Sequence, residues 1–240
     1  MKLVLVIPAR YESSRFPGKP LLMINGESMI KRVYDICLKS FDVESIYVAT
    51  DDERILSHCY EKKIKCLMTS KKCLTGTDRV AEVSKVIDAD FYINVQGDEP
   101  VFNYKDIDIL VNEVLNNPKY EVFCGYSELT DIDRLNSRDT PKLVINNLEE
   151  LVYISRSLIP GSKSEDVLKG FRQICAYAFS KKSLESFKNK KTYLEEIEDI
   201  EILRFIEKGI KVKMVKMSQD SIPIDRKEDL NRVLNYLNNV

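Results

Sequence analysis

The chain has 240 residues, and its 37 lysine and arginine residues nearly balance 38 aspartate and glutamate residues, which leaves a formal net charge of −1. This balance argues against bulk binding to nucleic acid, and the length suits one α/β domain with a full core. The N-terminus lacks an apolar signal region, and no apolar stretch approaches the roughly 20 residues that cross a bilayer. We therefore expect a cytoplasmic protein without stable membrane association.

The N-terminal segment is a strand-like run, Leu3 to Pro8, that leads directly into a loop with three cations, Arg10, Arg15 and Lys19. Loops at the carboxyl ends of strands bind ligands in open α/β sheets, and their backbone amides favour anions. Guanidinium forks and a lysine charge suit a triphosphate. The alternative is a solvated basic surface loop. The chain contains neither GxGxxG nor GxxxxGK[ST], so a dinucleotide fold and a P-loop lose their main support.

Strand and helix candidates alternate through the N-terminal part of the chain. Such alternation is typical of an α/β fold in which a mostly parallel central sheet is flanked by helices. The whole chain, residues 1–240, is predicted to form one such domain. The predicted order is strand Leu3–Pro8, helix Met29–Lys39, strand Ser45–Ala49, helix Glu53–Lys62, strand Lys65–Met68, helix Asp78–Val86 and strand Phe91–Val95.

The middle of the chain has a different pattern. Residues Glu121–Gly125 read as a further strand, and Lys142–Ile145 and Leu151–Ile154 read as a hairpin with a turn at Asn146 and Asn147. The polar run Gly161–Lys169 is expected to be a loop.

The segment Thr192–Gly209 is predicted to be one amphipathic helix, with Gly209 as its stop signal. Its acidic residues Glu195, Glu198 and Glu201 recur every three positions, and a solvated face is the default interpretation for all of them except Glu201. The apolar residues that define the pattern recur at the same interval; they are Leu194, Ile197, Ile200, Leu203 and Ile206.

The six cysteines form no CxxC pair, although three of them recur at intervals of seven residues. A metal or disulfide interpretation remains open for these three, but reduced and mostly buried thiols are the preferred interpretation. The single histidine, His58, falls in the helix predicted to begin near Asp52, where a surface or packed role is expected.

Short polar blocks with fixed order and spacing run through nearly the whole chain. They are Pro-Ala-Arg-x-x-Ser-Ser-Arg-x-Pro-Gly-Lys-Pro-Leu from Pro8, Val48–Ile55, Thr75–Val83, Asn94–Pro100, Ser155–Pro160, and Ile224 with Asp225 followed by Glu228–Leu230. In these blocks the chain closely resembles the 3-deoxy-manno-octulosonate cytidylyltransferases, also called CMP-Kdo synthetases.

This resemblance implies a glycosyltransferase-A-like nucleotidyltransferase fold with a small β insertion near residues 140–165. It also implies a homodimer, for which that insertion is a candidate contact. The implied reaction joins CTP and a 3-deoxy-octulosonate-type acid, Kdo or a modified Kdo, to give a CMP-sugar and pyrophosphate. Such CMP-sugars serve lipopolysaccharide biosynthesis.

Nucleotidyl transfer requires that the triphosphate be neutralised, and magnesium held by one or two carboxylates does this well. Asp98 follows a strand and a glycine, and it is predicted to bind metal, with an aspartate turn as the alternative. The resemblance gives Asp225 the same role, although an N-cap is the alternative there. Arg10, Lys19, Asp98 and Asp225 are the expected catalytic residues. The nucleotide is expected to contact Ala9, Arg10, Ser13, Arg15, Lys19 and Thr75.

The acceptor is an acid, so a cation must face its carboxylate. Arg79 lies near a helix start, where an arginine needs an anionic partner, and we expect that partner to be the ligand. The resemblance adds four further acceptor contacts, Gln96, Gln173, Tyr177 and Glu201.

The chain departs from the family at three of its customary positions. Cys73 and Gln173 replace two customary histidines, and Ile202 replaces a glutamine. A modified octulosonate, such as an amino-substituted one, therefore remains open as the acceptor. The alternatives are a nucleotidyltransferase for another sugar or sugar acid and a catalytically silent nucleotide-binding paralogue.

Overall fold

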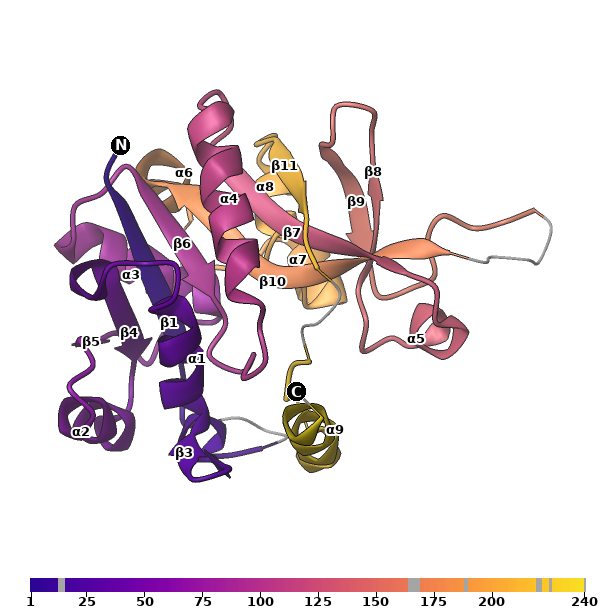
Figure 1. Ribbon diagram of the computed structural model, residues 1–240. Helices are drawn as coiled ribbons and strands as arrows, with labels where there is room; N and C mark the ends of the chain where they lie inside the picture. Colours follow the sequence, from indigo (N-terminus) through magenta and orange to yellow (C-terminus); the bar gives the residue numbers. More distant parts are fainter. Residues whose placement is uncertain (13–15, 164–168, 188–189, 219–221, 225, 240) are drawn as a thin grey trace.

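The computed structural model in Figure 1 describes residues 1–12, 16–163, 169–187, 190–218, 222–224 and 226–239. Its centre is a sheet in which the strand order is β11-β7-β10-β6-β1-β4-β5, and β8 and β9 extend it from β10. The strands are β1 (Leu3–Ala9), β4 (Ile46–Thr50), β5 (Cys66–Met68), β6 (Phe91–Val95), β7 (Val122–Leu129), β8 (Lys142–Ile145), β9 (Leu151–Ser155), β10 (Gly170–Ser180) and β11 (Val212–Lys216).

Parallel pairing dominates the half of the sheet that the alternating pattern predicted. β1 lies between β4 and β6 and pairs in parallel with both, and β4 pairs in parallel with β5. The antiparallel pairs all involve β10 or the β8–β9 hairpin. The prediction of a mostly parallel central sheet flanked by helices is confirmed.

Helices cover both faces of the sheet because the strand residues alternate between two apolar clusters. α1 (Met29–Cys37), α2 (Glu53–Glu61) and α4 (Tyr104–Asn116) pack on the face that includes Leu5, Ile7 and Ile93. α3 (Gly76–Val86), α6 (Lys181–Glu185) and α8 (Leu203–Glu207) pack on the other face, around Tyr92 and Phe179. The short elements are η1 (Lys19–Leu21), β2 (Met23–Ile24), β3 (Glu27–Ser28), η2 (Val43–Ser45), α5 (Ile132–Asn136) and α7 (Tyr193–Glu198).

The C-terminal helix α9 (Lys227–Asn238) lies apart from the sheet, next to the segment that follows β1 (Figure 1). Val233 on this helix and Ile224 before it share a third apolar cluster with Phe16, Ile24 and Met29. The last helix of the chain is thereby fastened to the end of the cation-bearing loop.

The predicted helix Thr192–Gly209 is wrong as a single helix. The chain forms α7, turns at Asp199 in the left-handed region with φ of 49°, and resumes as α8. The apolar residues recur every three positions, and such a spacing drifts around an α-helix of 3.6 residues per turn. The solvated-face interpretation is also wrong for Glu195, which is fully buried.

The hairpin is confirmed, but its connection is longer than the predicted two-residue turn. Residues Asn146–Glu150 join the two strands, Asn146 Oδ1 accepts bonds from the backbone N–H groups of Leu148 and Glu150, and Glu149 has φ of 57°. All six cysteines are free and four are buried, as expected for reduced thiols. Among the described residues, no helix combines the length and apolar character that a bilayer crossing requires.

Candidate active site

A cavity of about 370 Å³ opens at the carboxyl ends of β1 and β6. Its walls come from the loop after β1, the start of α3, the turn after β6, the strand β10 and the bend between α7 and α8. Polar blocks that are far apart in the sequence therefore meet at one edge of the sheet, as parallel strands predict. Ten of the predicted site residues line this cavity: Ala9, Arg10, Lys19, Thr75, Arg79, Gln96, Asp98, Gln173, Tyr177 and Glu201.

The two ends of the loop after β1 are held in fixed positions. The backbone N–H of Gly18 donates to the carbonyl of Tyr11 at 2.8 Å, and Gly18 has φ of 72°, which favours glycine. The Arg54 guanidinium lies 3.2 Å from the centre of the Tyr11 ring, and Asp52 holds that guanidinium at 2.7 Å. Arg10 is exposed and faces the cavity. Two predicted nucleotide contacts, Ser13 and Arg15, lie outside the described residues.

Lys19 joins three parts of the molecule at the cavity. Its Nζ donates to Asp98 Oδ2 at 2.7 Å and to the carbonyl of Ile224 at 2.6 Å. The backbone N–H of Ile224 in turn donates to the carbonyl of Asp98 at 3.0 Å. The loop lysine, the predicted metal ligand and the segment before α9 are thus directly connected.

Asp98 reaches the cavity because Gly97 allows the backbone to pass close to β1. A Cβ at Gly97 would lie 2.8 Å from the carbonyl oxygen of Pro8, so a larger residue would move the turn. The Asp98 side chain is 29% exposed. Asp225, the second predicted metal ligand, lies outside the described residues.

The donor chemistry at Asp98 fits magnesium. A carboxylate is the hard oxygen ligand that this ion prefers, and the ion commonly takes few protein ligands. The ion pair with Lys19 shows that the Asp98 carboxylate already accepts a cation here. In the described part of the chain, no three His, Cys, Asp or Glu side chains gather into a metal-binding group. Among the described residues, Asp98 is therefore the carboxylate that could hold the ion beside ligand phosphates.

The start of α3 carries Thr75 on the cavity wall and is fixed by a buried ionic network. Thr75 and Asp78 form a capping box, in which Asp78 Oδ2 accepts the backbone N–H of Thr75 at 2.8 Å. Asp78 Oδ1 accepts a bond from Arg204 at 2.8 Å, and Arg204 also pairs with Glu195 at 2.5 Å. Arg204 and Glu195 are both fully buried. This network joins α3, α7 and α8 beneath the cavity.

Glu201 extends from the bend between α7 and α8 to the same wall. Its Oε2 accepts the backbone N–H of Thr77 at 3.1 Å, and its Oε1 accepts from Gln96 Nε2 at 3.4 Å. Removal from water raises the pKa of the Glu201 carboxyl. Gly76 allows this approach, since a Cβ there would lie 2.9 Å from Gln96 Nε2.

Arg79 lies at the cavity wall, but its charge already has a partner in the protein. Its Nη2 donates to Asp51 at 2.7 Å and its Nη1 donates to the Thr69 hydroxyl at 2.8 Å. The arginine itself is only 3% exposed. The anionic partner that the sequence required at this helix start is therefore supplied by Asp51.

β10 supplies Gln173 and Tyr177 to the opposite wall. A register shift between Ile174 and Tyr177 interrupts the pairing of this strand with β7. Gln173 Nε2 contacts Cys124 Sγ at 3.6 Å. Tyr177 is 2% exposed, and burial raises the pKa of its hydroxyl well above the ordinary value.

Sequence reasoning missed Arg156, which lines the cavity beside Asp199. Its guanidinium donates to three backbone carbonyls: Nε to Glu198 at 2.5 Å, Nη1 to Arg138 at 3.0 Å and Nη2 to Asp199 at 3.0 Å. Among the described side chains, no carboxylate forms an ion pair with it. The block Ser155–Pro160 resembles the family, but nothing in its sequence distinguishes an arginine that only bonds to backbone carbonyls from one that contacts a ligand.

The family model for cytidylyltransferases matches residues 4–235. The chain belongs to the cytidylyltransferase family. The predicted nucleotidyltransferase fold and enzyme class are thereby confirmed.

Curated relatives match this cytidylyltransferase over nearly its full length. A 3-deoxy-manno-octulosonate cytidylyltransferase of Fusobacterium nucleatum is 37% identical over 239 residues, which cover 99% of this chain and 97% of the relative. A protein of Shewanella sp. (strain W3-18-1) is also 37% identical, over 237 residues that cover 97% of both chains. The Shewanella protein is named an 8-amino-3,8-dideoxy-manno-octulosonate cytidylyltransferase.

Solved structures show the same architecture. A CMP:2-keto-3-deoxy-manno-octonic acid synthetase complexed with CTP superposes with a TM-score of 0.92 at 32% identity, and the match covers 100% of this chain and 99% of the other. A glucose-1-phosphate thymidylyltransferase from Bacillus anthracis superposes with a TM-score of 0.72 at 17% identity, covering 99% and 96% of the two chains. The second likeness shows the shared fold alone.

Proposed function

We propose that this cytidylyltransferase joins CTP to a 3-deoxy-octulosonate-type sugar acid and releases pyrophosphate. The observation that carries the proposal is that one cavity brings together the cations Arg10 and Lys19, the Asp98 carboxylate and Arg156. An enzyme that joins a triphosphate to an acid needs positive charge for both anionic substrates. The names and full-length similarity of the curated relatives support the same substrates.

The phosphate end would hold the nucleotide through Arg10 and Lys19. The anomeric hydroxyl of the sugar would attack the α-phosphorus, the bond to pyrophosphate would break, and the hydroxyl proton would pass to water. Lys19 would exchange its present acceptors, Asp98 and Ile224, for phosphate oxygens, which carry more charge. Ser13 and Arg15 of the same loop are also proposed to contact the nucleotide, as are Ala9 and Thr75.

We propose Mg²⁺ as the cofactor, held by Asp98 and by Asp225. When bound, the ion would supply charge neutralisation for the triphosphate and the leaving pyrophosphate. Asp98 would give up its ion pair with Lys19 when it holds the ion, which leaves Lys19 to the phosphate oxygens. The protein's own contribution is to hold this carboxylate at the edge of the sheet, where Gly97 turns the chain.

Arg156 is the side chain best suited to the acceptor carboxylate. Three backbone carbonyls fix its guanidinium, and among the described side chains no carboxylate forms an ion pair with it, so it can pair with an anion. Arg79 remains a second proposed contact, although Asp51 offsets its charge. Gln96, Gln173, Tyr177 and Glu201 are proposed to contact the sugar hydroxyls.

One residue, Gln173, favours an amino-substituted octulosonate as an alternative acceptor. Gln173 at the cavity wall carries an amide carbonyl, which can accept a bond from an amine. The Shewanella relative bears the name of an enzyme for such an acid.

We also propose a homodimer that contacts through the insertion at residues 140–165. The β8–β9 hairpin projects beyond the main sheet (Figure 1), and it exposes Leu148 to 62% and Val152 to 52%. Sedimentation of the wild type and of Val152→Asp would test this, and an unchanged sedimentation coefficient would remove the hairpin from the interface.

The decisive experiment measures pyrophosphate release with each of the four NTPs and a panel of 2-keto-3-deoxy sugar acids. We expect turnover with CTP and an octulosonate, and loss of turnover when a chelator removes divalent metal. Turnover only with another nucleotide or a neutral sugar would overturn the substrate assignment. Nucleotide binding without any turnover would indicate the catalytically silent paralogue.

A further inference from the structure

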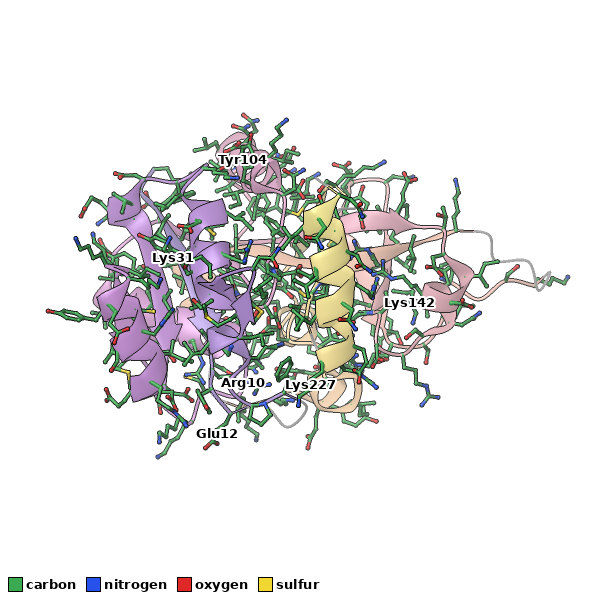
Figure 2. All side chains as sticks on the ribbon, turned by 60° about the horizontal axis from the view of Figure 1, so that its bottom comes forward. Arg10, Glu12, Lys31, Tyr104, Lys142 and Lys227 are labelled. Carbon is green, nitrogen blue, oxygen red and sulfur yellow. The ribbon has the colours of Figure 1, made fainter. Side chains whose placement is uncertain are left out.

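Lys142 on β8 is a buried cation next to Arg156, which lines the cavity. It is fully buried, and its Nζ donates to the carbonyl of Ser137 at 2.7 Å and to the carbonyl of Arg156 at 2.5 Å. Figure 2 shows it on the side of α9 opposite Arg10, away from the loop after β1.

A buried ammonium is costly, so its position needs an explanation. Among the described residues, no carboxylate lies within ion-pair distance of Lys142, and burial together with the nearby Arg156 charge lowers its pKa. Two carbonyl groups from different segments compensate for the lost water. A methionine would fill the same space without that desolvation cost, so packing alone does not account for a lysine here.

The two carbonyls belong to segments that both form the cavity wall. Ser137 begins the loop that carries Asp139 and Thr140 to the cavity, and Arg156 is the arginine assigned to the acceptor carboxylate. Arg156 also donates to the carbonyl of Arg138, within the same loop. Lys142 therefore fixes the backbone of Arg156 and the loop that orients its guanidinium.

The Arg156 backbone has a second support from α7. Its N–H donates to Glu198 Oε2 at 2.9 Å, and the Ser155 hydroxyl donates to Glu198 Oε1 at 2.6 Å. Lys142 holds the carbonyl side of the residue and Glu198 holds the N–H side. Charged side chains therefore hold the peptide units on both sides of Arg156 by hydrogen bonds. This arrangement suits a residue that must keep its guanidinium in one orientation.

We propose that Lys142 is a positioning residue for recognition of the acceptor carboxylate, acting through Arg156 and the 137–141 loop. The proposal rests on the assignment of Arg156 to that carboxylate. Lys142 itself does not touch the sugar acid. Its loss should weaken acceptor binding and leave nucleotide binding unchanged.

The test measures steady-state KM for CTP and for the octulosonate in Lys142→Met, Arg156→Gln and the double variant. We expect Lys142→Met to raise the acceptor KM about tenfold and to change the CTP KM less than about twofold, with no further loss when it is added to Arg156→Gln. Lys142→Arg can still donate to both carbonyls and should restore most of the acceptor affinity.

Lys213→Met is the matched control. Lys213 is a buried lysine on β11 at the far end of the same hairpin; it donates to the carbonyl of Leu148 at 3.1 Å and, unlike Lys142, it also pairs with a carboxylate, that of Glu149, at 2.8 Å. This variant should leave both KM values unchanged. If Lys142→Met does not fold by circular dichroism, Lys142→Gln, which can donate to one of the carbonyls, takes its place.

The outcomes separate this proposal from the proposed function. An unchanged acceptor KM in Arg156→Gln would overturn the carboxylate assignment and the role of Lys142 with it. A raised acceptor KM in Arg156→Gln, together with an unchanged one in the Lys142 variant, would overturn the role of Lys142 alone. Equal increases in both KM values, or losses that multiply in the double variant, would show that Lys142 acts on general stability and not through Arg156.

Discussion

Removing the charge of Arg204 should lower the free energy of unfolding and weaken nucleotide binding at the same time. Arg204→Met keeps a long apolar side chain over the Phe187 ring, which lies 3.7 Å from the guanidinium, but it removes the positive charge. Asp78 and Glu195 then remain as two carboxylates with no exposure to water and no shared cation.

The expected loss of unfolding free energy is large because water cannot solvate the carboxylates of Asp78 and Glu195. Breaking a buried ion pair by removal of one partner costs about 3–5 kcal/mol. For a chain of roughly 150–250 residues, about 1 kcal/mol shifts Tm by about 2–4 °C, so Tm should fall by about 6–20 °C. Asp78 also caps the turn that carries Thr75, so the KM for nucleotide should rise in the same variant.

Urea unfolding followed by circular dichroism measures the free-energy change. Arg232→Met serves as a control, because Arg232 is 60% exposed and lies 3.6 Å from Asp229 on the surface of α9. Exposed pairs contribute about 0–1 kcal/mol. A free-energy loss in Arg204→Met as small as that of the control would refute the reasoning that this network is both buried and dependent on its single cation.

Three further predictions concern the cavity. Lys19→Met should lower turnover about a hundredfold or more, because the charge faces developing anion in a site shielded from water, and pyrophosphate release within threefold of wild type would remove Lys19 from the mechanism. Glu201→Gln should stabilise the protein near pH 7 but not near pH 4. The folded state raises the pKa of the Glu201 carboxyl, so the protein loses stability as the pH rises from the unfolded pKa, about 4.3, through the folded pKa. Glutamine does not titrate, so the variant avoids this loss. Unfolding free energies at both pH values, with the exposed Glu196→Gln as control, check this, and a pH-independent difference would contradict it. Gln173→His should shift the ratio of kcat/KM values toward unmodified Kdo and away from its 8-amino analogue, since histidine replaces an amide carbonyl acceptor with a ring that can be cationic; an unchanged ratio would mean that Gln173 does not read the sugar.

The predictions succeeded best where the physical cause is local. α1 and α2 begin at the predicted Met29 and Glu53, where Ser28 and Asp52 accept backbone N–H groups, whereas the cap at Thr75 starts α3 two residues before the predicted Asp78. Pattern reasoning failed at Asp199, because a repeat of three looks helical in a sequence and cannot keep one face buried along a helix. The chain bends there, Glu195 turns inward to Arg204, and Glu201 turns to Gln96.

The site shows the same division between local and distant causes. Arg10, Lys19 and Asp98 could be placed at the cavity from the sequence, because each follows a strand and strands of a parallel sheet end at one edge. The partners of the arginines could not be found. Arg79 is paired with Asp51, 28 residues away in the chain, whereas the Arg156 guanidinium is held by backbone carbonyls.

The sequence by itself therefore determined the alternating α/β architecture, the cation-bearing loop after the first strand and the place of Asp98 after a strand, since these follow from short-range patterns. Only the tertiary structure decided the order of strands in the sheet and the partners of the buried charges. Lys142 and Arg204 are both fully buried cations, and their partners matter because burial removes water and makes the nearest acceptor decisive. Lys142 donates to two backbone carbonyls, whereas Arg204 pairs with Asp78, 126 residues away in the chain.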